Sequence, residues 1–315
     1  MLLRLFLLLA IVASLLGCVD HENVKDVLNE SLKRCNNNSY EVTIVKKIAI
    51  EDRSLKTQKV ERGIFKGNKF KIFDERYSVV SNGSIVWMYD NKTGLLIVDD
   101  YSRSNEKPKN IFASLILRLM NCSSLSMNVT NDSYIVTGVN KEAVKVWIDR
   151  KTFIPRKSEV KSNFYGFNVT YITVFENLTF RKVDESEFNV TFPKVDVIRV
   201  THLQKIDDAR KKLNFTIIAI HNPDFNLERI DVIERKGFKA VALQYLGLDG
   251  CHLTVIETPQ HDLTTKGEEI LISGVKVFYD NGIKFSLKNV TINVLSDCLG
   301  KQELISVVKS MINGN

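Results

Sequence analysis

The chain has 315 residues, of which 44% are hydrophobic and 26% charged, and its formal net charge is +7 at pH 7. This length permits two domains, each large enough to bury a core of its own. The net positive charge predicts mild attraction to an anionic membrane surface. Because acidic and basic residues are interspersed along the sequence, the charge pattern argues against a nucleic-acid-binding surface.

The first eighteen residues carry the pattern of an export signal that ends in a lipid-attachment cysteine. Arg4 gives a positive start, residues 5–16 are apolar, and Gly17 precedes Cys18. The apolar stretch is shorter than the roughly 20 residues that span a bilayer, so we expect cleavage. The mature chain would then be anchored by a lipid on Cys18 at the extracytoplasmic face of the cell membrane. The alternative is an ordinary secretory signal that ends in a cysteine, which also predicts export.

Acceptor sequences for N-linked glycans are frequent. Twelve of the 26 asparagines lie in Asn-x-Ser/Thr, whereas Ser and Thr make up about an eighth of the chain, so chance would place about three. The use of asparagine in turns explains some sites but not the excess. With the lipid-attachment pattern, the excess indicates an archaeal surface lipoprotein that carries N-linked glycans. The twelve are Asn29, Asn37, Asn82, Asn91, Asn121, Asn128, Asn131, Asn168, Asn177, Asn189, Asn214 and Asn289.

Beyond Cys18 the sequence has four cysteines, an even number that predicts disulfides in an exported protein. Three pairings are possible, and with two domains the simplest joins Cys35 to Cys122 and Cys251 to Cys298. Four free buried thiols are the alternative. The sequence shows no cysteine and histidine spacing typical of zinc, and we predict no metal or cofactor.

The predicted elements begin with a short amphipathic helix over residues 22–34, followed by a half-buried strand over 40–50 in which apolar residues alternate. Turn signals such as Asn82-Gly83 then recur at short intervals and predict an antiparallel meander. One segment, residues 111–120, is apolar on nearly every face of a helix and therefore predicts a buried helix. The strands that follow it are expected over 134–139, 144–149, 155–161, 168–175 and 178–182.

A different pattern begins near residue 201, with a helix expected over 206–213 and a closing amphipathic helix over 301–312. Between them the sequence predicts strands over 229–235, 240–246, 252–257, 269–272, 275–279, 284–287 and 290–295. The predicted fold class is α+β, mainly β. The predicted organisation is a lipoprotein signal peptide over 1–18, a sheet domain with a covering helix over 19–196, and a smaller α+β domain over 197–315.

Three segments of the first half share an ordered pattern: a turn glycine before a Trp-x-Tyr strand (83–89), a Trp-x-Asp and Pro-Arg hairpin (147–156), and a closing Phe-x-x-x-x-Pro (188–193). With residues 59–65, they resemble the LolA/LppX superfamily of lipoprotein carriers, which includes the amino-terminal domain of the periplasmic regulator MucB/RseB. The second half resembles a small domain of unknown function that follows such carriers in exported proteins.

This resemblance implies an incomplete antiparallel β-barrel whose concave face and covering helix enclose an apolar cavity for acyl or isoprenoid chains. Each methylene moved from water into such a cavity contributes roughly 0.8 kcal/mol. An ordinary buried helix without a ligand is the alternative for residues 111–120, and strand tryptophans are more often plain core. The cavity and lid candidates are Phe70, Ile72, Trp87, Ile111, Phe112, Leu115, Ile116, Leu119 and Trp147.

The sequence therefore predicts a membrane-anchored, extracytoplasmic lipoprotein that binds lipid or lipoprotein chains, similar to an outer membrane lipoprotein-sorting protein. Because the histidines are dispersed and no catalytic motif is present in the sequence, we expect no enzymatic activity. The alternative is an envelope sensor or regulator of the MucB/RseB type, which would bind a partner protein such as a membrane protein. A purely structural glycoprotein of the cell surface is a third hypothesis.

Overall fold

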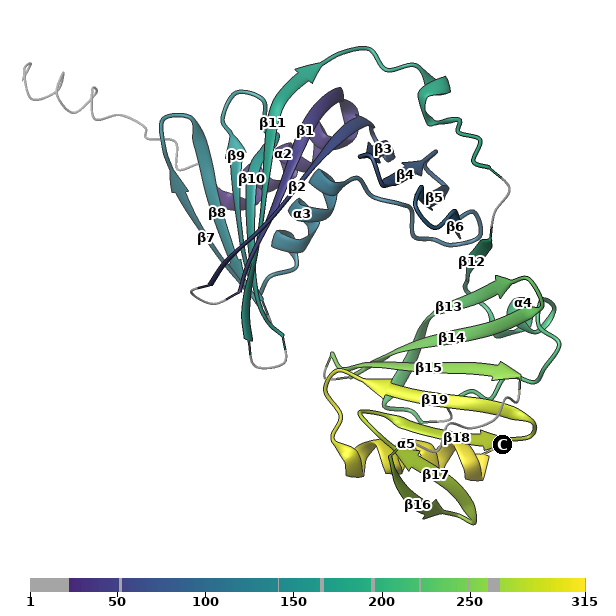
Figure 1. Cartoon of the computed structure of the whole chain (residues 1–315). Helices are drawn as coiled ribbons and strands as arrows, with labels where there is room; N and C mark the ends of the chain where they lie inside the picture. The colour runs from purple at the N-terminus through teal and green to yellow at the C-terminus, as the bar shows by residue number, and fades with distance from the viewer. Residues whose placement is uncertain are drawn as a thin grey trace, which may run out of the picture. The chain divides into compact units, whose positions relative to one another are not determined.

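The structure, a computed structural model, describes residues 23–50, 53–140, 142–164, 167–193, 196–220, 222–248, 250–259 and 267–314. The predicted signal peptide and the lipid-attachment residue Cys18 lie outside these ranges. The described chain divides into two compact units (Figure 1). Unit 1 comprises the described residues before Asn68 and Asn110–Lys182, and unit 2 comprises Asn68–Lys109 and the residues from Val183 onward. Among the described helices, none has the length and hydrophobicity that a membrane span requires.

Unit 1 is built on one open antiparallel sheet in the order β2–β1–β11–β10–β9–β8–β7. Figure 1 shows these strands side by side. Their bounds are β1 (Ser39–Ile50), β2 (Arg53–Lys66), β7 (Ser124–Val129), β8 (Ser133–Val139), β9 (Ala143–Asp149), β10 (Pro155–Phe164) and β11 (Phe167–Phe180).

Two helices, α2 (Val24–Asn37) and α3 (Ile111–Met120), pack against each other and against this sheet. The start of α3 is fixed by Asn110, whose side-chain oxygen accepts a hydrogen bond from the Ala113 N–H at 2.9 Å. The amide nitrogen of the same buried side chain donates to the carbonyls of Gly67 and Cys35. One residue therefore ties the apolar helix to the end of α2 and to the end of β2.

The core of unit 1 lies between these helices and the sheet. Phe112 packs among Tyr40, Phe65 and Phe175, with ring centroids 4.4 to 5.3 Å from its own. Further along α3, Ile116 and Leu119 contact valines of β8, β9 and β10. The apolar helix has the bounds that the sequence predicts, and the reason for its composition is this burial on most sides.

Unit 2 begins with an antiparallel meander of β3 (Lys69–Phe73), β4 (Tyr77–Ser81), β5 (Ile85–Asp90) and β6 (Leu95–Asp100). β6 pairs in parallel with β12 (Val197–Leu203). From β12 an antiparallel sheet continues in the order β13–β14–β15–β19–β18–β17–β16. Its bounds are β13 (Phe225–Arg235), β14 (Phe238–Gly247), β15 (His252–Pro259), β16 (Glu268–Ile272), β17 (Val275–Tyr279), β18 (Ile283–Leu287) and β19 (Val290–Ser296).

Unit 2 also has three described helical elements: a 3-10 helix η1 (Glu185–Phe188), α4 (Ile206–Arg210) and α5 (Lys301–Gly314). α5 buries Leu304, Val307, Val308 and Met311 in the core of unit 2. α4 is shorter than the helix expected over 206–213. After Arg210 the chain continues as a turn in which the N–H groups of Lys212 and Leu213 both donate to the Ala209 carbonyl.

The division into two units does not coincide with the single domain boundary after residue 196 that the sequence predicts. The parallel β6–β12 pairing attaches residues 68–109 to the carboxy-terminal sheet, although the sequence places them within the amino-terminal meander. The structure is mainly β with a few helices, and its sheets are open. The incomplete barrel and the division into domains stay predictions.

Candidate functional site

The nine residues expected to line one apolar cavity fall in both units. Those on β3 and β5, in unit 2, are Phe70, Ile72 and Trp87. Those on α3 and β9, in unit 1, are Ile111, Phe112, Leu115, Ile116, Leu119 and Trp147. Neither unit holds the complete set.

Within unit 1 the residues of α3 belong to the core. Phe112, Ile116 and Leu119 are fully buried by protein, and Ile111 and Leu115 are half-buried. This placement favours the alternative stated for the helix, which is an ordinary buried helix.

Trp147 points to the opposite face of the sheet. Its neighbours Val146 and Ile148 belong to the core beside α3, and side chains alternate along a strand, so the indole lies on the outer face. There the ammonium groups of Lys157 and Lys145 lie 4.4 and 4.8 Å from its ring centroid. The indole therefore takes part in cation–π contacts on the outer surface.

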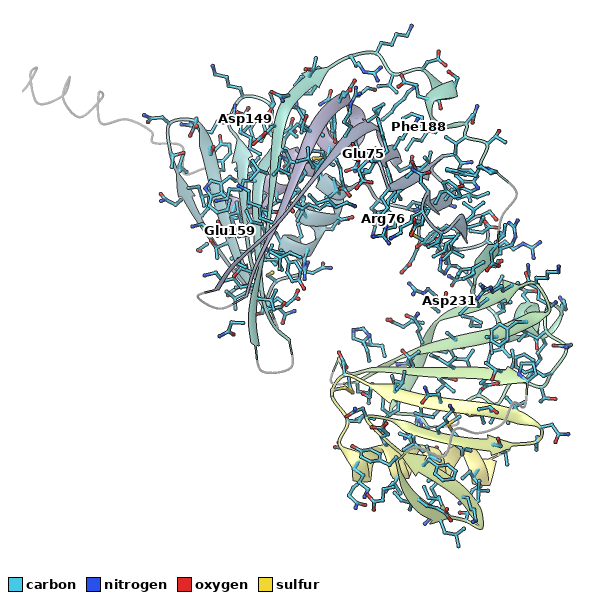
Figure 2. The ribbon with its side chains drawn as sticks, in the orientation of Figure 1. Glu75, Arg76, Asp149, Glu159, Phe188 and Asp231 are labelled. Carbon is cyan, nitrogen blue, oxygen red and sulfur yellow. A yellow bond between two sulfur atoms is a disulfide. The ribbon has the colours of Figure 1, made fainter. Side chains whose placement is uncertain are left out.

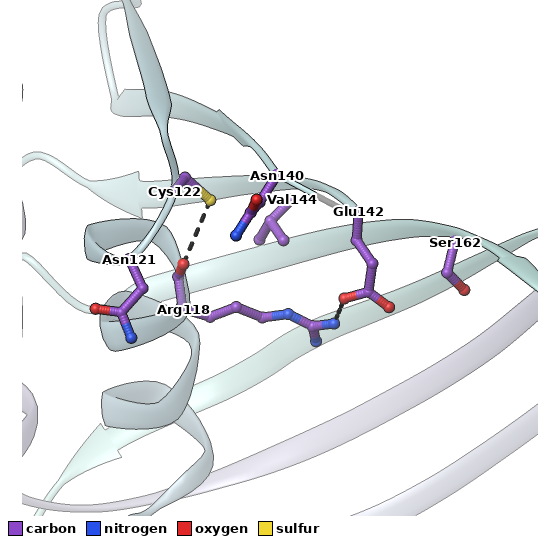
Figure 3. Close-up of a pocket in the computed structure, with 7 residues that line it drawn as sticks. All are labelled: Arg118, Asn121, Cys122, Asn140, Glu142, Val144 and Ser162. Carbon is purple, nitrogen blue, oxygen red and sulfur yellow. Dashed lines mark hydrogen bonds and ion pairs between the residues drawn. The ribbon is translucent and has the colours of Figure 1, made fainter. Parts of the chain in front are cut away.

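A different hollow, of about 470 Å³, lies at the carboxy-terminal end of α3 (Figure 3). It is lined by Arg118, Asn121, Cys122, Asn140, Glu142, Val144 and Ser162. The size falls within the range of about 300 to 1,000 Å³ that is usual for small-molecule sites. We call it the α3 hollow.

Strand alternation explains why these side chains converge. Val144 of β9 lies directly opposite Val160 of β10, and both belong to the core under α3. Two residues further along the same face come Glu142 and Ser162, beyond the last turn of the helix. The α3 hollow therefore opens on the helix-covered face of the sheet, at the point where the helix ends.

An ion pair between Arg118 of α3 and Glu142 crosses the α3 hollow (Figure 3). Both side chains are partly exposed. Asn140 and Ser162, whose side chains can donate hydrogen bonds, line the same hollow. Arg118 therefore offers a planar, permanently charged donor whose present carboxylate partner a ligand anion could replace.

The Cys122 thiol closes one side of this hollow. It donates to the Arg118 carbonyl at 3.3 Å, and a Cβ added to Gly138 would lie only 2.6 Å from its sulfur, so it is closely packed. Burial raises the pKa of the Cys122 thiol, although Arg118 opposes this shift. The thiol is therefore neutral near pH 7 and a poor nucleophile.

Sequence reasoning missed the α3 hollow, although one signal was present. Arg118 is the only charged residue in the otherwise apolar stretch 111–120. A lone charge at the end of a buried helix identifies the end that faces solvent, and here Arg118 is also the cation among the described residues that line the hollow.

A second polar group, in unit 2, surrounds the buried His202 of β12. Its Nδ1 lies 2.6 Å from the carboxylate of Asp231, and its Nε2 lies 2.6 Å from that of Asp99. Asp231 is labelled in Figure 2. Burial alone would lower the pKa of His202, but hydrogen bonds to Asp231 and Asp99 and their charges outweigh it and raise this pKa to about 9. With both ring nitrogens engaged, the imidazole has no free lone pair for base catalysis.

The four cysteines that the structure describes form one disulfide and two free thiols. Cys251 and Cys298 are bonded across 47 residues, whereas Cys35 and Cys122 are free, in place of the second pairing that seemed simplest from the sequence. Cys35, near the end of α2, lies beside the start of α3, where its carbonyl accepts a hydrogen bond from Asn110, whereas Cys122 follows the other end of α3. Ten helical residues separate these ends by about 15 Å, well beyond the reach of a disulfide.

No protein-family model matches the sequence, and no curated protein matches it. Among solved structures, MucB in complex with MucA(peri) is similar over 92% of this chain and 97% of its own, with 11% identity and a TM-score of 0.38. The Pseudomonas aeruginosa MucA/MucB complex is similar over 90% of this chain and 96% of its own, with 13% identity and a TM-score of 0.42. A DUF1329 family protein from Desulfovibrio piger is similar over 52% of this chain and 94% of its own, with 12% identity and a TM-score of 0.28. These likenesses concern the fold, and no residue role is transferred from them.

Proposed function

We propose that the protein is an extracytoplasmic binding protein whose unit 1 holds the anionic head group of an amphipathic ligand at Arg118. The observation that carries this proposal is the Arg118–Glu142 ion pair across the α3 hollow. Arg118 places a cation at a hollow of ligand size. Its carboxylate partner, Glu142, is partly exposed, so a ligand anion can replace it.

The exchange is energetically reasonable. A solvent-exposed ion pair typically contributes 0 to about 1 kcal/mol, so releasing Glu142 costs little. A ligand carboxylate or phosphate would pair with the Arg118 guanidinium and accept hydrogen bonds from Asn140 and Ser162. Hydrogen bonds to charged groups contribute about 1.5–3 kcal/mol each.

The apolar part of the ligand would follow the helix-side face of the sheet. Tyr171 of β11 lies directly opposite Val160, which packs under α3, yet Tyr171 is 44% exposed. An acyl or isoprenoid chain, the class implied by the sequence resemblance, would cover this ring. Each methylene buried there would add roughly 0.8 kcal/mol.

Location and mode of action follow from the sequence. An export signal ending at Cys18 would tether the mature protein to the outer face of the membrane by a lipid on that cysteine. In this proposal the protein binds its ligand without chemical conversion, and the tether keeps it at the surface where amphipathic ligands reside.

Binding of a fluorescent long-chain fatty acid to the exported, mature protein tests the proposal, with the matching fatty alcohol as the uncharged probe. Wild type should bind the acid more tightly than the alcohol. Arg118→Gln should weaken binding of the acid by at least about tenfold and leave the alcohol unchanged. Glu142→Gln should tighten binding of the acid by up to about fivefold, since it removes the competing carboxylate.

Arg156→Gln is the matched control, because Arg156 is another ion-paired arginine of unit 1, on β10. It should bind both probes like wild type. Equal affinity of wild type and Arg118→Gln for the acid would refute the anionic-head proposal.

A partner-binding role is the second candidate, supported by a hollow of about 370 Å³ in unit 2 beside α5. Leu248, 77% exposed, lines it together with Phe225, Leu299 and Val307. The rest of the lining is Asn222, Asp224, Gly247, Glu303 and Ser306, so the hollow combines apolar and polar side chains and suits a side chain of a protein partner. Leu248→Asp should abolish recovery of a stoichiometric membrane-protein partner, whereas Leu271→Asp, at a leucine of β16 that is 69% exposed, should not.

A further inference from the structure

We propose that Asn128 and Asn131 carry N-linked glycans that cover the open edge of strand β7 in unit 1. The inference is independent of the ligand proposed for the α3 hollow. It rests on the composition of the strands at the ends of the described sheets and on the positions of two acceptor asparagines.

Edge strands expose unpaired backbone groups and are commonly protected by charged side chains or proline. In unit 1 the sheet ends at β2 and at β7, and β2 carries Lys59, Glu61 and Arg62. In unit 2 the strand order runs from β3, which carries Lys69 and Lys71, to β16, which begins with Glu268 and Glu269. These end strands are protected by charge.

β7 lacks this protection. Its sequence, Ser-Leu-Ser-Met-Asn-Val, contains neither a charged residue nor a proline, and among the described residues it pairs with β8 alone. Leu125 and Met127 point into the core, while Val129 is exposed. An edge of this composition invites pairing with a second chain.

The acceptor asparagines lie where glycans would shield this edge. Asn128 is exposed within β7, directly opposite Ile135 and on the face away from Met127. Asn131 is exposed in the turn that joins β7 to β8. A glycan on each would surround the strand from its outer face and from its end.

Exposure is general among the acceptor sites. Eleven of the twelve acceptor asparagines are exposed in the structure. The twelfth, Asn82, is half-buried, and its Oδ1 accepts hydrogen bonds from the N–H groups of Ser84 and Ile85. Asn121 lines the α3 hollow, where a glycan would crowd the mouth of the hollow. The proposal concerns Asn128 and Asn131 because these two acceptor asparagines lie on β7 and in the turn that follows it.

The modification is a glycosyl transfer to the side-chain amide. The Asn Nδ2 forms a bond to C1 of the first sugar of a lipid-linked oligosaccharide phosphate donor, and the bond from C1 to the phosphate oxygen breaks. The lipid phosphate leaves with the electron pair, and the nitrogen gives one proton to a base of the transferase. Transfer to the exported chain before folding would leave Ser133, which is buried in the folded state, accessible as part of the Asn131 acceptor sequence.

Intact mass and glycopeptide mapping of the protein purified from the cells that naturally make it test the site assignment. We expect peptides containing Asn128 and Asn131 to carry glycans, and the Asn128→Gln/Asn131→Gln variant to lose the mass of two glycans. Unmodified Asn128 and Asn131 in the native protein would overturn the proposal.

Sedimentation tests the shielding. The Asn128→Gln/Asn131→Gln variant, made in the same cells, should form concentration-dependent oligomers through β7. The matched control is Asn29→Gln/Asn214→Gln, which removes two exposed acceptor sites outside the strands and should stay in the wild-type state. A β7 variant that sediments like this control would overturn the shielding role. Adding Ser126→Lys to the β7 variant should restore the wild-type state.

Discussion

The imidazole of His202 lies 2.6 Å from the carboxylate of Asp231 on one side, and Asp99 occupies the same distance on the other. These three residues come from β12, β13 and β6, so the buried cluster joins the 68–109 segment to the carboxy-terminal sheet of unit 2. Gln244 and Arg229 also donate to Asp231, at 2.8 and 3.1 Å, which leaves this carboxylate well satisfied.

His202 should make the stability of the protein depend on pH. Its pKa of about 9 in the folded state exceeds the ordinary value of 6.5. The stabilisation is therefore fully present below pH 6.5 and is lost as the pH rises from 6.5 to about 9, by on the order of 1–3 kcal/mol. His202→Gln should flatten the unfolding free energy over this range in urea titrations. The exposed His252→Gln is the control, and an unchanged slope in His202→Gln would contradict the account.

Glu257 should add a second pH dependence at lower values. It is fully buried, both of its oxygens accept from the Ile218 N–H, and burial raises its pKa from 4.5 to about 8. Its contribution is present below pH 4.5 and is lost as the pH rises through about 8. Glu257→Gln keeps an acceptor for Ile218 without titrating. Unfolding measured between pH 5 and 8 should then be less pH-dependent than in wild type, and an equal pH dependence would argue against a neutral buried acid.

Phe112 distinguishes a packed core from a ligand cavity. Because its ring is enclosed by Tyr40, Phe65 and Phe175, Phe112→Ala should lower the free energy of unfolding by about 3–5 kcal/mol. Leu115→Ala, on the same helix but half-buried, should cost less. A Phe112→Ala protein of nearly wild-type stability that loses fatty-acid binding would instead place Phe112 in the ligand site.

The Cys251–Cys298 disulfide should stabilise unit 2. For a loop of 47 residues, the chain-entropy treatment gives about 4 kcal/mol. The Cys251→Ser/Cys298→Ser variant should therefore unfold at a clearly lower urea concentration. Cys122→Ser, which alters a free thiol, should have a small effect, and equal losses in the two variants would contradict the assignment of bonded and free cysteines.

Local patterns in the sequence were sufficient to predict several elements. The bounds of α3 follow from its apolar run, and Asn110, immediately before it, is a residue type that commonly caps the amino-terminal end of a helix. The burial of Val144, Val146 and Ile148 alternates with Trp147, so strand period alone could have placed this indole on the outer face. That period separates Trp147 from the cavity candidates on α3, which lie on the other face of the sheet.

Long-range features were not accessible in this way. The parallel pairing of β6 with β12 joins residues about a hundred positions apart, and no local period encodes it. The same holds for the cluster around His202 and for the separation of Cys35 from Cys122 by the length of α3. The α3 hollow needs both the end of a helix and a hairpin turn of the sheet, and Arg118 was its only local signal.

Native mass spectrometry followed by organic extraction tests the central claim most directly. The mature protein without residues 1–18, produced in an exporting host, should carry a discrete anionic amphiphile that is extractable from wild type and absent from Arg118→Gln. An apo mass for wild type, together with failure to take up a long-chain carboxylate probe, would contradict the account and favour the partner-binding role of unit 2.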